Sequence, residues 1–346
     1  MSTRLSSQNE HNVNLGFMEC FTSCVMTYVR VMGWDHRNLL LNYWNLDYQH
    51  QTLLGSKDSR KFSMDYLYGV DMNYVAGDLA SLTGHIRQGY SVILLCMASR
   101  LDYFPRALLS MESSGFQHSI LILGLDAESG FHVLDPIVNF SGFTTTAVVA
   151  NAGATGRSET LHYFTLSEKK VDSLPSSQEI LAFCSRRNLE FYEHPSQSVK
   201  IPGGGNQEER KQAWIEWFSN RRGGTQSFRL FIADLMASLE WPEQKRSSWG
   251  KRNSMTLSSI RQLRRQVWNT YREFMQLDQA AAEEGDQQIS HIMNLWQRFH
   301  YLLLRLLSAG DKPRTAELIC RKVEELEQAE IRFLSWLNQK VMMGHG

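Results

Sequence analysis

Three residues whose types cooperate in nucleophilic catalysis stand in three distinct local settings. Cys20 opens an apolar run that extends to residue 33 and ends in glycine. His118 begins a run of strand-forming residues, and Asp135 ends the next such run. A thiol at a helix start, a histidine on a strand and an acid on the neighbouring strand are the parts of a papain-like nucleophile site. The sequence therefore predicts Cys20, His118 and Asp135 as catalytic residues for acyl chemistry.

The position of the cysteine within its run matters for its reactivity. A helix N-terminus and a nearby imidazolium both lower the pKa of a thiol. Cys24 lies one turn deeper on the same face, where the field of the helix end has faded, so Cys20 is the preferred nucleophile. An oxyanion needs two donors. We expect the backbone N–H of Cys20 and the side-chain amide of Asn14, with Gln8 and Asn12 as weaker candidates.

Other uses of these residue types remain possible. Cysteines in apolar helices are usually buried packing residues, so a structural role for Cys20 stays open. The cysteines and histidines do not follow the spacing of zinc ligands, and no glycine-rich phosphate-binding or dinucleotide-binding pattern occurs. We therefore expect neither a metal site nor a resident cofactor.

Length and composition restrict the class of protein. A chain of 346 residues is long enough for two domains. Its 36 basic and 36 acidic residues give a net charge of zero, so no general attraction to nucleic acid or anionic membrane is expected. The chain begins without a secretory signal pattern and has no apolar run of about 18 residues. Five scattered cysteines favour reduced thiols and a cytoplasmic location.

Hydrophobic periodicity predicts an α+β fold with an antiparallel sheet in residues 1–170. The settings of Cys20, His118 and Asp135 make this the predicted papain-like domain. The alternating runs at 118–125 and 131–135 are typical of an antiparallel hairpin, and Gly33 is a plausible helix terminator. One helix packed on a meandering sheet is an α+β design. The predicted elements are helices over 20–32 and 76–88 and strands over 91–97, 118–125, 131–135 and 159–165.

The second half has a different pattern. Residues 171–206 are expected to form a connecting helix and a polar linker. Residues 207–346 repeat apolar residues every three or four positions and predict an all-α helical bundle. The predicted helices cover 207–219, 226–240, 256–282, 287–308 and 314–342.

These residues also resemble a known family. The run from Cys20 to Gly33 resembles the helix of bacteriocin-processing cysteine peptidases, in which a cysteine begins the helix and a glycine ends it at this distance. The run from His118 to Asp126 and the Asp135-Pro136 pair match as well. A papain-like domain followed by a helical domain is similar to a sister group, the butirosin biosynthesis protein H-like family. The chain departs from the peptidase pattern by having Phe21-Thr22-Ser23 after the cysteine and Asn14, in place of glutamine, six residues before it.

The resemblance implies an acyltransferase of natural-product biosynthesis. It would move an acyl group from a carrier-protein thioester to an amine or hydroxyl acceptor, through an acyl-cysteine intermediate. The triad implied by position is Cys20, His118 and Asp135. A thioesterase, a leader-trimming cysteine peptidase and a non-catalytic binding protein on a degenerate papain-like fold are the alternatives.

A carrier protein as partner would need a docking surface. Residues 244–267 contain seven lysines and arginines and no acid. In the helical part of this segment, Arg261, Arg264 and Arg265 stand at helical spacing. They are therefore the predicted docking residues for an acidic carrier domain whose phosphopantetheine bears the substrate. A solvated helix face is the alternative interpretation.

Overall fold

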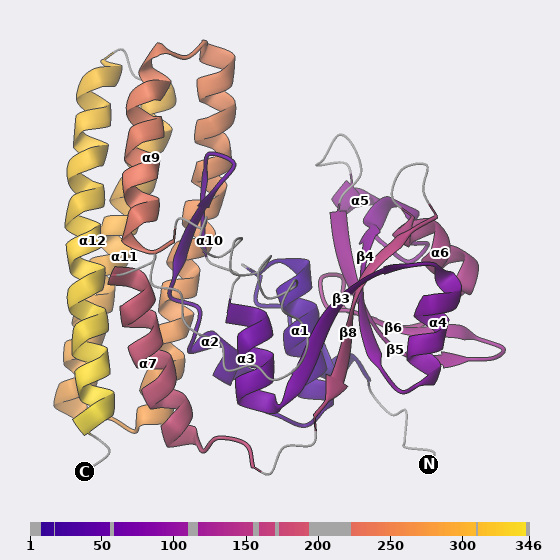
Figure 1. The fold of residues 1–346 in the computed structure, drawn as a ribbon. Coiled ribbons are helices and arrows are strands. Elements are labelled where there is room, and N and C mark those ends of the chain that lie inside the picture. Colours follow the sequence, from indigo (N-terminus) through magenta and orange to yellow (C-terminus); the bar gives the residue numbers. More distant parts are fainter. Residues whose placement is uncertain are drawn as a thin grey trace, which may run out of the picture. The chain divides into compact units, whose positions relative to one another are not determined.

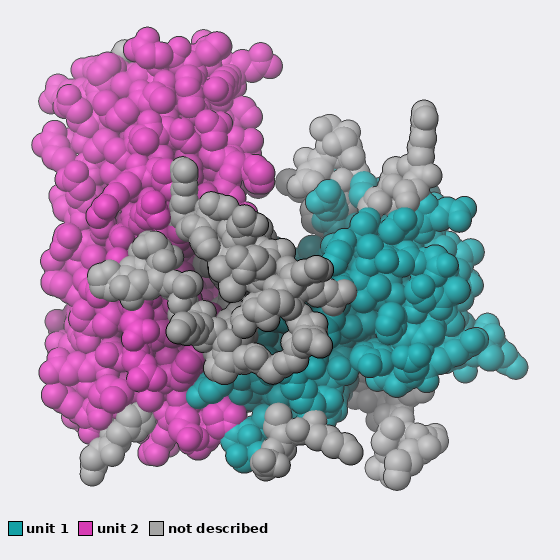
Figure 2. Space-filling model, viewed as in Figure 1, with its two compact units in different colours: residues 1–39, 60–174 teal, residues 40–59, 175–346 magenta. Residues whose placement is uncertain are grey.

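The computed structural model describes residues 8–16, 18–55, 59–109, 117–154, 159–169, 173–193, 223–308 and 311–343. The fold is α+β, as predicted: a region with an antiparallel sheet is followed by a helical region. Figure 2 colours the two compact units into which the chain divides. Unit 1 contains residues 1–39 and 60–174, and unit 2 contains residues 40–59 and 175–346. The second unit thus differs from the expected continuous domain, because it includes a segment from the N-terminal part of the chain.

Unit 1 is built on a six-stranded sheet in which every neighbouring pair is antiparallel. Its strand order is β3-β8-β4-β5-β6-β7 (Figure 1). The predicted hairpin of residues 118–135 is confirmed as the β5–β6 pair. The strands are β3 (Val70–Gly77), β4 (Ser91–Met97), β5 (Gln117–Asp126), β6 (Gly130–Asp135), β7 (Phe140–Thr144) and β8 (Leu161–Glu168).

Helices cover both faces of this sheet. Figure 1 shows α1 (Cys20–Val31) and α3 (Ser59–Tyr68) beside one face, and α4 (Leu79–Arg87) and α6 (Thr146–Gly153) beside the other. The shorter elements are η1 (Gln8–His11), α2 (Arg37–Leu40), η2 (Ala98–Arg100) and α5 (Arg106–Leu109). Between the sheet and the pair α4 and α6 lies an apolar core that includes Leu82, Val92, Leu94, Ile120, Ile122, Val133 and Val149.

Helix α1 begins at Cys20, as its sequence pattern predicts, and ends at Val31, one residue before the predicted end. Its apolar residues at helical spacing are buried, among them Cys24, Val25 and Val29. Gly33 follows the C-cap residue Met32 and has a φ of 81°, in the left-handed region that glycine adopts at no steric cost. The N–H groups of Gly33 and Trp34 donate to carbonyl groups of the last helical turn. This glycine termination fixes the length of the helix whose other end carries Cys20.

Two strands and several helices of unit 1 were not predicted. Strand β3 buries Val70 and Met72, but no residue of its second half is buried and Tyr74 has an exposed fraction of 51%. The alternation between apolar and polar residues is therefore lost halfway along the strand, and residues 76–77 instead suggested the start of a helix. That helix begins at Leu79, where the side chain of Asp78 accepts a hydrogen bond from the N–H of Ser81.

Unit 2 consists of long helices and one small hairpin. Its helices are α7 (Ser177–Glu193), α9 (Thr225–Ala237), η3 (Ser238–Glu240), α10 (Glu243–Met275), α11 (Gln279–Ser308) and α12 (Lys312–Met343). The helix predicted over 207–219 lies outside the described residues. The helix predicted over 256–282 is instead part of α10 and α11, because Gln276, with a φ of 48°, ends α10 in the left-handed region. The indoles of Trp44, Trp249, Trp268 and Trp296 are all buried in this unit.

The hairpin of unit 2 comes from the N-terminal part of the chain. Strands β1 (Leu46–Gln49) and β2 (Thr52–Gly55) pair antiparallel through a two-residue turn at His50 and Gln51, both at positive φ. The N–H of Leu53 donates to the side chain of Asn253 on α10, with a distance of 2.9 Å between the two heavy atoms. These contacts make the hairpin an integral part of the helical unit. None of the described helices is long and apolar enough to cross a membrane.

Candidate active site

Cys20 is the first residue of α1. The residue before it, Glu19, has an extended backbone, and its side chain does not cap the helix. The first intrahelical hydrogen bond runs from the N–H of Ser23 to the carbonyl of Glu19. The N–H groups of Cys20 and Phe21 therefore have no carbonyl acceptor within the helix. The thiol thus stands at the positive end of the helix, beside backbone donors of the kind that stabilise an oxyanion.

His118 and Asp135 come together across the β5–β6 hairpin. The two strands pair from Leu121 and Leu134 onward, so His118 and Asp135 lie at the adjoining strand ends. The Nε2 atom of His118 lies 2.7 Å from Oδ2 of Asp135, and both side chains have an exposed fraction of 0%. A buried carboxylate at this distance orients the ring and stabilises its protonated form.

Cys20 and His118 influence each other's ionisation. Burial raises the pKa of the Cys20 thiol, but the hydrogen bond and positive charge of His118 outweigh it and leave this pKa below its ordinary value. Burial lowers the pKa of His118, but hydrogen bonds with Asp135 and Cys20 outweigh it and raise this pKa to about 9. The lowered pKa of Cys20 and the raised pKa of His118 together favour a thiolate beside an imidazolium.

Cys24 does not share this environment. It is fully buried, and its thiol donates to the carbonyl oxygen of Ser119 at a distance of 3.3 Å. Burial and the negative charge of Asp135 raise the pKa of this thiol well above its ordinary value. Cys24 is therefore held as a neutral thiol, and Cys20 is the cysteine with nucleophilic character.

Asp135 is itself held by groups that the sequence pattern did not reveal. Its Oδ1 accepts a hydrogen bond from the N–H of Ile137 at 3.1 Å, and its Oδ2 accepts one from the Tyr103 hydroxyl at 3.4 Å. The ring of Tyr103 stacks on Phe140 with centroids 3.8 Å apart. Tyr103 lies in the connection between β4 and β5, far from Asp135 in sequence. No local spacing could therefore have indicated its role.

Asn14 lies near the loop that follows Asp135. Its Nδ2 donates to the carbonyl of Ile137 at 3.3 Å, and its Oδ1 accepts from the N–H of Gly16 at 2.9 Å. Asn12 likewise donates to the carbonyl of Phe140. These contacts tie the segment before α1 to the connection between β6 and β7. Asn14 therefore stabilises the backbone in this part of the chain, and its role as an oxyanion donor stays a prediction. The side chain of Gln8 lies outside the described residues.

Aromatic side chains extend from the residue after Cys20 across the edge of the sheet. Phe21 meets Phe164 edge-on at 4.9 Å, and Phe164 meets Tyr74 at 5.5 Å. The hydroxyl of Tyr74 lies 2.6 Å from Nδ1 of His162. The guanidinium of Arg60 lies over Phe21, 4.7 Å from the ring centroid. An apolar or planar substrate group could pack on this strip next to the thiol.

The predicted docking arginines do not share one exposed face, which corrects that prediction. Arg264 has an exposed fraction of 0% and forms a two-pronged ion pair with Glu330 on α12. Arg261 is half-buried, and Arg265 is exposed. The spacing by three and four residues placed them close together, but Arg264 points into the bundle. The sequence pattern could not show that Glu330, far along the chain, supplies its partner.

Comparisons with known proteins assign the chain to no family. No protein-family model matches the chain, and no curated protein is similar to it. Among the described residues, no group of three or more His, Cys, Asp or Glu side chains could hold a metal ion.

Proposed function

We propose that the protein is an acyltransferase with a papain-like catalytic domain, in which Cys20 carries the acyl group as a thioester. The observation that supports this proposal best is the placement of Cys20 at the start of α1, together with the buried hydrogen bond between His118 and Asp135. It combines a thiol of lowered pKa with a histidine of raised pKa and a buried orienting carboxylate. This combination is what nucleophilic acyl chemistry requires.

In the first half of the proposed reaction, the Cys20 thiolate attacks the carbonyl carbon of a carrier thioester. A bond between this carbon and the Cys20 sulfur forms, and the carbonyl oxygen becomes an oxyanion near the N-terminal N–H groups of α1. The intermediate then breaks its bond to the sulfur of the carrier. The departing thiolate takes the proton of His118, which leaves the carrier thiol and acyl-Cys20.

In the second half, an amine or hydroxyl acceptor attacks acyl-Cys20. His118, now neutral, takes the proton of the acceptor as the new bond to carbon forms. The Cys20 thiolate departs, and the protonated His118 stands beside it again. The sum is one acyl group moved from carrier sulfur to acceptor nitrogen or oxygen. A carrier thioester as donor and an amine as preferred acceptor are supported by the family resemblance of the sequence.

Intact-protein mass spectrometry after incubation with acyl-pantetheine thioesters tests this proposal. We expect an adduct of one acyl mass on the peptide that contains Cys20, and its loss on addition of an amine acceptor with formation of the amide. Cys20→Ala should form no adduct. Cys24→Ala is the matched control and should still be acylated. A wild-type protein that remains unmodified would contradict the proposal, and an adduct released only as free acid would indicate a thioesterase.

A further inference from the structure

Helices α10 and α11 of unit 2 bring three large apolar side chains to the surface. Met255 on α10 has an exposed fraction of 73%, and Tyr301 and Leu304 on α11 have exposed fractions of 62% and 41%. The two helices run beside each other at this level, because Ser254 Oγ lies 2.6 Å from Nε2 of His300. The three apolar side chains therefore belong to one region of the surface.

The same region is bordered by positive charge. Lys251 and Arg252 on α10 and Arg298 and Arg305 on α11 are exposed, and they lie within one helical turn of the apolar residues in sequence. Within the part of the chain that the structure describes, none of these four forms an ion pair. We name the four cations together with Met255, Tyr301 and Leu304 the α10–α11 patch.

Neither helix carries an acid near this patch. Residues 244–272 of α10 and residues 287–308 of α11 contain no Asp or Glu. Glu243 stands at the first position of α10, and the other acids of this helical hairpin stand near its turn, for instance Asp286, which pairs with Arg272. A predominantly cationic border around an apolar centre is complementary to an acidic partner that also presents apolar side chains.

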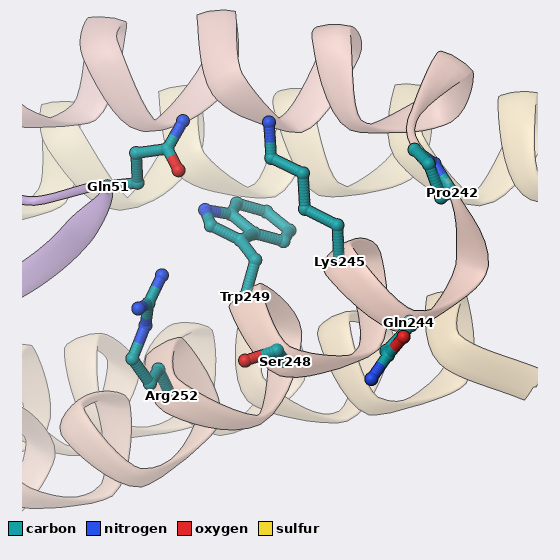
Figure 3. Close-up of a pocket in the computed structure, with 7 residues that line it drawn as sticks. All are labelled: Gln51, Pro242, Gln244, Lys245, Ser248, Trp249 and Arg252. Atoms are coloured by element: carbon teal, nitrogen blue, oxygen red, sulfur yellow. The ribbon is translucent and has the colours of Figure 1, made fainter.

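The cationic border continues into a depression at the start of α10. Figure 3 shows Lys245 and Arg252 on either side of the Trp249 indole, with Gln51 of the β-hairpin opposite. The volume of this depression is about 430 Å³. The ammonium group of Lys245 lies 4.1 Å from the ring centroid of Trp241. Arg252 thus belongs both to the depression and to the α10–α11 patch, so the positive surface extends over one end of the helix pair.

We propose that the α10–α11 patch docks an acidic, helical carrier domain that delivers the acyl thioester. The identity of this partner rests on the proposed function, whereas the surface itself rests on the exposed side chains and their charge. Arg298 and Arg305 then make ion pairs with acids of the carrier, and Met255 and Tyr301 pack against its apolar residues. Such an interface depends on ionic strength, because its cations are exposed.

The experiment compares two acyl donors on the full-length protein. One donor is an acetylated, phosphopantetheine-bearing acyl carrier protein of fatty-acid synthesis, and the other is acetyl-pantetheine, which has no protein to dock. The variants are Arg298→Glu/Arg305→Glu and Met255→Asp, and the matched control is Arg321→Glu, an exposed charge reversal on α12. The rate of Cys20 acetylation is measured by intact-protein mass spectrometry, and carrier binding is measured by calorimetric titration.

We expect the double charge reversal to lower acetylation from the carrier by at least tenfold and to leave acetylation from acetyl-pantetheine unchanged. Met255→Asp should act in the same direction, and Arg321→Glu should alter neither rate. If the carrier protein acetylated Cys20 at the same rate in the wild type and in both patch variants, the docking proposal would be overturned. The acyl-cysteine chemistry would be left intact. If neither donor acetylates Cys20, the proposed function fails, and the calorimetric titration alone decides docking: equal or absent binding in the wild type and the variants overturns it.

Discussion

The ring of Phe104 meets the imidazole of His118 edge-on, with centroids 5.1 Å apart. Asp135 holds the Nε2 side of the same ring, and burial removes it from water. An imidazole fixed on two sides cannot turn away from its partners at little cost. The mutual effect of His118 and Cys20 on each other's ionisation is therefore a property of the resting protein, and its consequences can be measured without any substrate.

The first prediction concerns the pH dependence of Cys20 alkylation. The pKa of the thiol is lowered, so the reactive thiolate should persist below the pH range of an ordinary cysteine, and the imidazolium beside it should persist up to a pH of about 9. In His118→Asn the burial of the thiol is no longer offset, so the inflection should move above that of the wild type. Iodoacetamide labelling between pH 5 and 10 measures both curves, and Cys20→Ser gives the background from the other cysteines. Coincident inflections in wild type and His118→Asn would contradict the coupling.

The second prediction separates the groups that hold the imidazole. Asp135→Asn removes the negative charge beside His118 and should lower the rate of Cys20 acylation by about a hundredfold or more. Tyr103→Phe removes only a hydroxyl that lies 3.4 Å from Asp135, so the loss should stay within about tenfold. A positioning role for Tyr103 also predicts that its variant shifts the pH inflection of labelling in the same direction as Asp135→Asn. A Tyr103→Phe curve identical to that of the wild type would refute this role.

The sequence predicted those features of the site that depend on residues close together in the chain, and missed those that depend on residues far apart. Cys20 at a helix start, and His118 and Asp135 at strand ends, follow from short-range periodicity, which the structure reproduces in α1, β5 and β6. Sequence periodicity could not predict the role of Tyr103, because its hydrogen bond to Asp135 depends on the path of the chain between β4 and β5. The same limit explains Arg264, whose spacing indicated an exposed face although Glu330, 66 residues away, holds it inside.

The third prediction concerns this buried pair. Glu330 accepts hydrogen bonds from Arg264, from the Trp296 indole at 2.6 Å and from the Tyr192 hydroxyl. Glu330→Gln leaves the Arg264 charge buried without a counter-charge, so we expect a loss of about 3–5 kcal/mol in the free energy of unfolding. The double variant Arg264→Met/Glu330→Leu should recover part of this loss, since it removes both charges. Urea denaturation followed by tryptophan fluorescence measures these differences, and a single variant as stable as the wild type would show that the pair is not needed.

The fourth prediction tests the attachment of the β-hairpin to the helical unit. Asn253, which is fully buried, accepts from the N–H of Leu53 and donates to the carbonyl of Gln51 at 3.0 Å. Asn253→Ala leaves these backbone groups unsatisfied and should cost about 1–3 kcal/mol in the free energy of unfolding. Ser248→Ala, at an exposed position of the same helix, is the matched control and should change stability by less than about 0.5 kcal/mol. Equal stability of the two variants would mean that Asn253 does not anchor the hairpin.

The membership of residues 40–59 in the second unit has a consequence for the order in which the protein matures. A ribosome releases this segment early, long before it translates α10, whose Asn253 receives the hairpin. Until α10 is made, residues 40–59 lack the helix to which their hairpin attaches, while the residues on both sides of them belong to unit 1. Unit 2 therefore depends on a segment that is made before most of unit 1, and separating the units by cutting the gene near residue 174 would deprive the C-terminal product of its own hairpin.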